Sequence, residues 1–120
     1  MVVDELDALR DKFKGCTAIA FADLSTQMIL VTDSSSNLRR EALDALCAEA
    51  ALLLGAKGKP ALAEKPSDLA TVTSPTELRV FVRAATDPND VLCCICGPST
   101  DAAAFVANAG ECLDRISSGD

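Results

Sequence analysis

Residues 38–54 read LRREALDALCAEAALLL, an alanine- and leucine-rich run with scattered charges. At 100° per residue the run has one broad apolar side, which predicts a helix packed on a core. Gly55 follows and is predicted to end the helix, because glycine readily adopts the conformation found just after helix C-termini. The core-facing side carries Leu43, Leu46, Cys47, Ala50, Leu53 and Leu54.

The same predicted helix has a second apolar strip on another side, interrupted only by Glu49. A helix that is apolar around most of its circumference is normally buried on more than one side. In a chain of 120 residues, a second subunit is one source of that additional cover. The strip consists of Leu38, Ala42, Ala45 and Leu52.

The chain before this helix predicts another helix and a β-hairpin. Residues 2–13 place apolar side chains at the three- and four-residue spacing of one helical face. Thr17–Ala22 and Met28–Thr32 are short apolar runs joined by a short connection, which predicts two antiparallel strands. Their near-continuous apolarity predicts that both faces of both strands are covered. Ser36 or Asn37 is the predicted N-cap of the central helix.

The chain after this helix predicts a loop and three strands. Ala56–Pro66 is basic and rich in glycine and proline, so we expect an exposed loop there. Leu69–Thr73 is a short predicted strand, and Glu77–Ala84 alternates in the two-residue period of a second one. Val91–Cys96 is entirely apolar, which predicts a central strand buried on both faces.

A last helix is predicted after Ser99 or Thr100, either of which is a suitable N-cap. The predicted order is therefore α-β-β-α-β-β-β-α. We expect an α/β (α+β) fold in which helices pack against an antiparallel five-stranded sheet. Residues 1–120 are expected to form a single domain, because two domains of half this length would each be too small to support a core.

Charge limits the choice of partners. Eleven basic and 18 acidic residues give a formal net charge of −7. Affinity for nucleic acid comes mainly from Lys and Arg that neutralise phosphates, so we expect no nucleic-acid partner. No apolar run is long enough to cross a bilayer, and the acidic N-terminal region has the wrong sign for a signal peptide. We therefore expect a cytoplasmic protein without membrane insertion and with protein partners.

The six cysteines are expected to be buried, reduced thiols, because cytoplasmic thiols stay reduced and free cysteine packs as a small apolar residue. Cys93, Cys94 and Cys96 form the densest cluster. On a strand, Cys94 and Cys96 share one face while Cys93 points to the other, so the three cannot easily bind one ion. No metal site is predicted, and redox pairing with Cys16 or Cys112 is the less favoured alternative.

No catalytic machinery is predicted. A serine or cysteine nucleophile usually needs a nearby base, and the chain has no histidine. There is no P-loop or GxGxxG motif, and the glycine-bearing stretch 55–59 follows a helix, whereas a phosphate cradle precedes one. We therefore expect neither a cofactor nor an enzymatic reaction. The acidic residues on predicted exposed faces or turns include Asp4, Asp7, Glu41, Asp44, Asp87, Asp90, Glu111 and Asp114.

The element order, at this length, resembles the roadblock/dynein light-chain family, whose α/β domain is profilin-like. The likeness lies in the order and apolarity of the elements and covers nearly the whole chain. Its four stretches are the first hairpin (15–23 and 28–31), the central helix (42–55), the closing hairpin (78–82 and 91–95) and the terminal helix (102–116).

Proteins of that family are compact regulators that form homodimers or heterodimers, and both are compatible with this sequence. The family dimers pair through the central helix and the strand after it, which joins two sheets into one. Bacterial and archaeal relatives often modulate small Ras-like GTPases, while eukaryotic ones belong to dynein and lysosomal scaffolds. The resemblance implies a dimer or partner interface at Leu38, Ala42, Ala45, Glu49, Leu52, Leu69, Thr71 and Thr73.

These observations predict a non-catalytic, dimeric regulatory or scaffolding protein, with a small Ras-like GTPase as the expected partner. The alternative is a small-molecule-binding sensor domain of profilin-like or PAS-like architecture, with a pocket between the sheet and the helices. The many small alanine and cysteine side chains would leave room for such a pocket.

Overall fold

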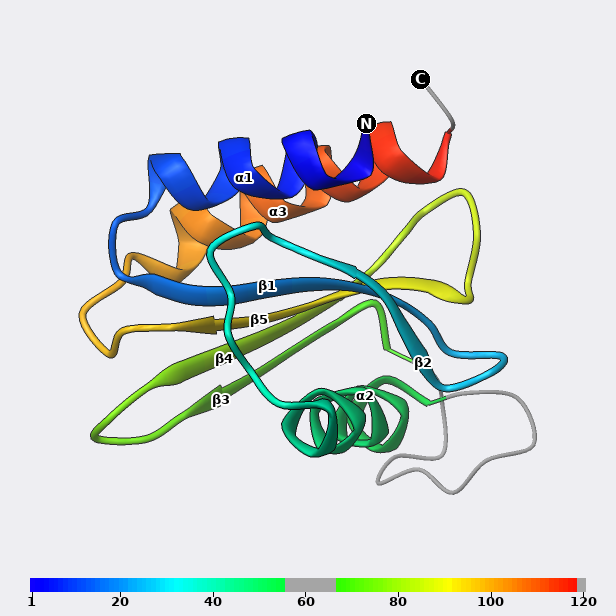
Figure 1. The fold of residues 1–120 in the computed structure, drawn as a ribbon, viewed down its shortest axis with the longest axis horizontal. Helices are drawn as coiled ribbons and strands as arrows, with labels where there is room; N and C mark the ends of the chain where they lie inside the picture. The colour runs from blue at the N-terminus through cyan, green and yellow to red at the C-terminus, as the bar shows by residue number, and fades with distance from the viewer. Residues whose placement is uncertain (56–66, 119–120) are drawn as a thin grey trace.

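The structure, a computed structural model, describes residues 1–55 and 67–118 (Figure 1). The predicted basic loop at 56–66 lies outside the described residues. The predicted order of helices and strands is confirmed. The elements are α1 (Val2–Lys12), β1 (Cys16–Asp23), β2 (Met28–Thr32), α2 (Arg40–Leu54), β3 (Leu69–Thr73), β4 (Leu78–Arg83), β5 (Asp90–Cys96) and α3 (Ala102–Ser117).

The five strands form one antiparallel sheet with the order β2-β1-β5-β4-β3. β5 lies in the middle and is hydrogen-bonded to β1 and β4, as the apolar run Val91–Cys96 predicted. The two shortest strands, β2 and β3, form the edges of the sheet.

Helices α1 and α3 lie side by side on one face of the sheet, and α2 lies alone on the other (Figure 1). Each face has its own buried cluster of apolar side chains. The alternation along β5 distributes the cysteines between these clusters, as predicted: Cys94 and Cys96 face α1 and α3, while Cys93 faces α2. All six cysteines are buried.

The expectation that both faces of the first hairpin are covered holds for β1 and is wrong for β2. Met28 and Leu30 of β2 are 44% and 52% exposed. β2 is an edge strand, and an irregularity in its pairing with β1 leaves Leu30 without a cross-strand partner. An apolar run alone does not distinguish an edge strand from an inner one.

Both predicted N-caps are wrong. α2 begins later than expected, with Arg39 in the cap position, because the Ser34 backbone and hydroxyl bind Asp7 and the Ser36 N–H donates to the Asp33 carbonyl. These contacts hold the serine-rich segment in a turn before the helix. At α3, Asp101 is the cap, and its carboxylate accepts a hydrogen bond from the backbone N–H of Ala104 at 3.1 Å.

Candidate functional site

The outward side of α2 is one part of the predicted interface that the structure leaves exposed. Ala42, Ala45 and Leu52 are exposed, although they belong to an apolar strip. Ala48 lies on the same exposed side and was missed by the sequence analysis, although its spacing from Ala45 and Leu52 is helical. We call Ala42, Ala45, Ala48 and Leu52 the α2 strip.

Two further residues of the predicted interface are placed differently. Leu38 lies before the first residue of α2 and is therefore not part of the helix. Its side chain is half-buried. Glu49 is half-buried beside the α2 strip, where its Oε1 accepts a hydrogen bond from Nη1 of Arg79 on β4 at 2.7 Å. The Arg79 guanidinium also lies 3.0 Å from the Glu77 carboxylate. The Arg79–Glu49 ion pair explains how a carboxylate can interrupt an apolar strip: Glu49 has a counter-ion within the chain, which it shares with Glu77.

The predicted residues of β3 lie at the sheet edge but do not share a face with α2. Leu69, Thr71 and Thr73 are the register partners of β4 residues whose side chains pack toward α1 and α3. Ala70 and Val72, between them, pack toward α2 instead. The β3 and α2 residues therefore meet at one edge of the molecule without forming one continuous face.

β3 offers its backbone as well as its side chains. It pairs with β4 on one side, and its other side pairs with no strand among residues 1–55 and 67–118. Leu69, Thr71 and Thr73 are exposed along it. An edge strand without charged or proline residues is a template for pairing with another chain, and β3 has neither.

Arg83 fixes the end of α2 against the sheet. Its side chain, only 7% exposed, donates to the carbonyl oxygens of Leu54, Gly55, Ser67 and Pro88 at 2.6–3.1 Å. The last carbonyls of a helix lack partners within the helix, and a cation there is also favoured by the helix dipole. Arg83 thereby ties the C-terminus of α2 to the start of β3 and to the β4–β5 turn.

Asp33 has the equivalent role before α2. It is 1% exposed, and its carboxylate accepts hydrogen bonds from the Ile19 N–H at 3.0 Å and from Nη1 of Arg10 at 2.6 Å. The Asp33 side chain therefore joins the end of β2 to both β1 and α1. Asp33 and Arg83 thus hold the segments that lead into and out of α2.

In the described ranges 1–55 and 67–118, no three His, Cys, Asp or Glu side chains gather to hold a metal ion. The acidic residues named from the sequence are exposed or half-buried. None of the helices in these same ranges is long and apolar enough to span a bilayer.

No protein-family model matches this chain, and no curated protein matches its sequence. Solved structures match its fold. The Roadblock/LC7 domain from Streptomyces avermitilis superposes with a TM-score of 0.71 at 12% identity, over 95% of this chain and 92% of that one. MglB from Myxococcus xanthus superposes with a TM-score of 0.71 at 15% identity, over 99% of this chain and 96% of that one. LokiProfilin1, solved in complex with rabbit actin, superposes with a TM-score of 0.63 at 16% identity, over 98% of this chain and 94% of that one.

At these identities the matches establish the fold. The chain has the Roadblock/LC7 fold, with the three helices and the antiparallel sheet in the arrangement expected from the sequence.

Proposed function

We propose that this protein is a non-catalytic, cytoplasmic regulatory or scaffolding protein that acts as a homodimer. The observation that carries this proposal is the α2 strip, an exposed row of three alanines and one leucine on a helix whose other side is in the core. Small side chains allow the backbones of two helices to approach closely. Two copies of the α2 strip packed together would bury this row on both chains.

The free edge of β3 lies at the same side of the molecule and would add backbone hydrogen bonds between the two sheets. Glu49 would flank the helix contact with its counter-ion, Arg79, already in place within each chain. The dimer surface would thus combine the α2 strip and Glu49 with the backbone and exposed side chains of β3.

For the partner of this dimer we propose a small Ras-like GTPase. The support is the resemblance of this sequence to the roadblock family, in which many bacterial and archaeal members modulate such GTPases. The LokiProfilin1 match, solved with actin, is a case of a similar fold in contact with another protein.

The first test is the solution mass by light scattering over a dilution series under reducing conditions. We expect the mass of two chains down to low micromolar concentration. A single-chain mass throughout would contradict the dimer. In that case the sensor interpretation would be examined by native mass spectrometry for a small molecule that purifies with the chain.

The Arg79–Glu49 ion pair gives a second prediction. In Arg79→Met, the Glu49 carboxylate would be buried at the dimer surface without its partner, so we expect the dimer dissociation constant to rise about tenfold or more. Analytical ultracentrifugation measures this constant. Arg40→Met is the control, because Arg40 pairs with Asp44 in the open, and it should leave the constant within about twofold. Equal constants for Arg79→Met and the unmodified protein would remove Glu49 from the interface.

A further inference from the structure

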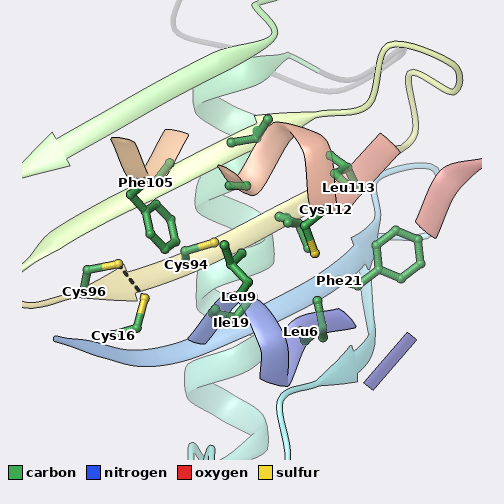
Figure 2. Packing of buried hydrophobic residues seen from close by; sticks show 14 of the residues in the cluster. Leu6, Leu9, Cys16, Ile19, Phe21, Cys94, Cys96, Phe105, Cys112 and Leu113 are labelled. Carbon is green, nitrogen blue, oxygen red and sulfur yellow. Dashed lines mark hydrogen bonds between the residues drawn. The ribbon is translucent and has the colours of Figure 1, made fainter. Parts of the chain in front are cut away.

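Cys16 and Cys96 face each other at one end of the central strand pair. Cys16 opens β1, Cys96 closes β5, and the two are direct partners in the antiparallel register. Their sulfur atoms are 2.8 Å apart and point toward each other beside Cys94 and Phe105 (Figure 2). The two residues are 80 positions apart in the sequence.

The backbone around this pair suits a covalent link. The Cys16 N–H donates to the Phe13 carbonyl at 2.9 Å, and the hydrogen bond next to the pair runs from the Gly97 N–H to the Gly15 carbonyl at 2.8 Å. The cysteines are therefore a non-hydrogen-bonded cross-strand pair, in which Cα atoms lie about 4.5 Å apart and side chains approach most closely. That spacing is near the lower limit for a disulfide, where the bond is more easily reduced.

The thiol chemistry separates this pair from the other cysteines. The two thiols share a hydrogen bond in which either sulfur can donate; with Cys16 as the donor, the bond lowers the pKa of the Cys96 thiol against the opposing effect of burial and raises the pKa of Cys16. Burial raises the pKa of Cys47, Cys93 and Cys94, and raises that of Cys112 to about 11. The Cys16–Cys96 hydrogen bond can therefore stabilise a thiolate on the sulfur that accepts it, whereas burial opposes a thiolate at the other four cysteines.

We propose that Cys16 and Cys96 are a redox-modification site that forms a reversible intramolecular disulfide with a small peroxide as oxidant. Both residues are buried, at 3% and 1% exposure, so a small oxidant is required. The Cys96 thiolate attacks one peroxide oxygen, forming a sulfenic acid and releasing hydroxide. The Cys16 sulfur then attacks the Cys96 sulfur and loses its proton, and the sulfenic hydroxyl leaves as water. Two thiols and one hydrogen peroxide thus give one disulfide and two waters.

The disulfide would change the molecule in a measurable way. Joining residues 80 positions apart removes conformational freedom from the unfolded chain, so the oxidised protein should melt at a higher temperature than the reduced one. The pair faces α1 and α3, on the side of the sheet opposite α2. The site is therefore independent of the dimer proposal, and oxidation should leave the solution mass unchanged.

The test uses the reduced full chain and equimolar hydrogen peroxide, followed by acid quenching and alkylation of free thiols in denaturant. Mass spectrometry should show a species that has lost two hydrogen atoms and carries four alkyl groups on its six cysteines. Dithiothreitol should restore all six thiols and should lower the melting temperature again to that of the reduced protein. Alkylation of all six cysteines, addition of oxygen atoms instead of loss of hydrogen, or a link between two chains on a non-reducing gel would each overturn the proposal.

Variants identify the partners. Cys16→Ala and Cys96→Ala should each abolish the two-hydrogen loss. Cys94→Ala is the matched control, because Cys94 lies on the same strand and the same face two residues away, and it should retain the disulfide. Loss of the disulfide in a folded Cys94→Ala variant, or its persistence in Cys96→Ala, would assign the bond to another pair. If a variant fails to fold, identification of the disulfide-linked peptides from the oxidised, unmodified protein shows which two cysteines are joined.

Discussion

Replacing Ala45 with arginine is expected to convert the dimer into single chains at low micromolar concentration. Ala45 lies in the middle of the α2 strip and is exposed in the single chain. A guanidinium there would hold two helices apart, and across a twofold axis it would approach its own copy. We expect the dissociation constant to rise at least a hundredfold, or about 3 kcal/mol. Light scattering over a dilution series measures the change.

The same substitution should leave the fold of each chain intact. Glu41 and Glu49 lie four residues before and four residues after position 45, so an arginine there gains favourable helical neighbours. The far-ultraviolet circular dichroism spectrum of Ala45→Arg should match that of the unmodified protein. A loss of helix signal would mean that the variant tests folding instead of association.

Ala107→Arg is the matched control for this experiment. Ala107 is an exposed alanine in the middle of α3, in the helical layer on the other face of the sheet. We expect this variant to remain a dimer. If Ala45→Arg remains a dimer and Ala107→Arg becomes monomeric, the dimer forms through the α1/α3 layer and the proposed interface is wrong.

Replacing Arg83 with methionine is expected to lower the free energy of unfolding by about 3–4 kcal/mol. Methionine preserves part of the buried aliphatic stem, but it removes the Arg83 donors from four carbonyl oxygens. Within residues 1–55 and 67–118, only that of Leu54 then keeps a hydrogen bond, from the Ser67 N–H at 2.7 Å. Removing a charged donor that binds buried acceptors is one of the few single changes that lowers the free energy of unfolding by this much. Urea denaturation at fixed protein concentration, followed by circular dichroism, gives the value.

Two variants interpret that result. Arg115→Met removes a surface ion pair to Glu5 and should cost no more than about 1 kcal/mol. Arg83→Lys keeps the charge without the planar set of donors, so we expect it to recover less than half of the loss. Full recovery by lysine would show that charge at the end of α2 matters more than the hydrogen bonds to its carbonyls.

The sequence was sufficient to predict those helices and strands whose apolar residues recur with a regular period. The two-residue period of β4, the apolar run of β5 and the helical spacing in α2 each depend on neighbours along the chain, and each prediction is confirmed. The exposure of Ala42, Ala45 and Leu52 is compatible with the predicted second apolar side of α2. Their role in a dimer remains a prediction.

What the sequence could not show depends on residues far apart in the chain. Arg83 alternates with Val82 like any outward residue of a strand, and its acceptors are backbone carbonyls at the end of α2. Asp33 begins a serine-rich segment that resembles a helix cap, while its partners lie on α1 and β1. The exposure of β2 follows from its place in the sheet, which local apolarity does not encode.

The antiparallel arrangement of α1 and α3 has a practical consequence for experiments. The start of α1 and the end of α3 lie together in the helical layer, with the whole sheet between them and α2 (Figure 1). Arg115 and Glu5 bridge the two helices near those ends, at 2.6 Å. A fluorophore, biotin or sensor-chip tether attached at either end should therefore leave α2 free, so that immobilised protein can still be titrated with a second copy or a GTPase.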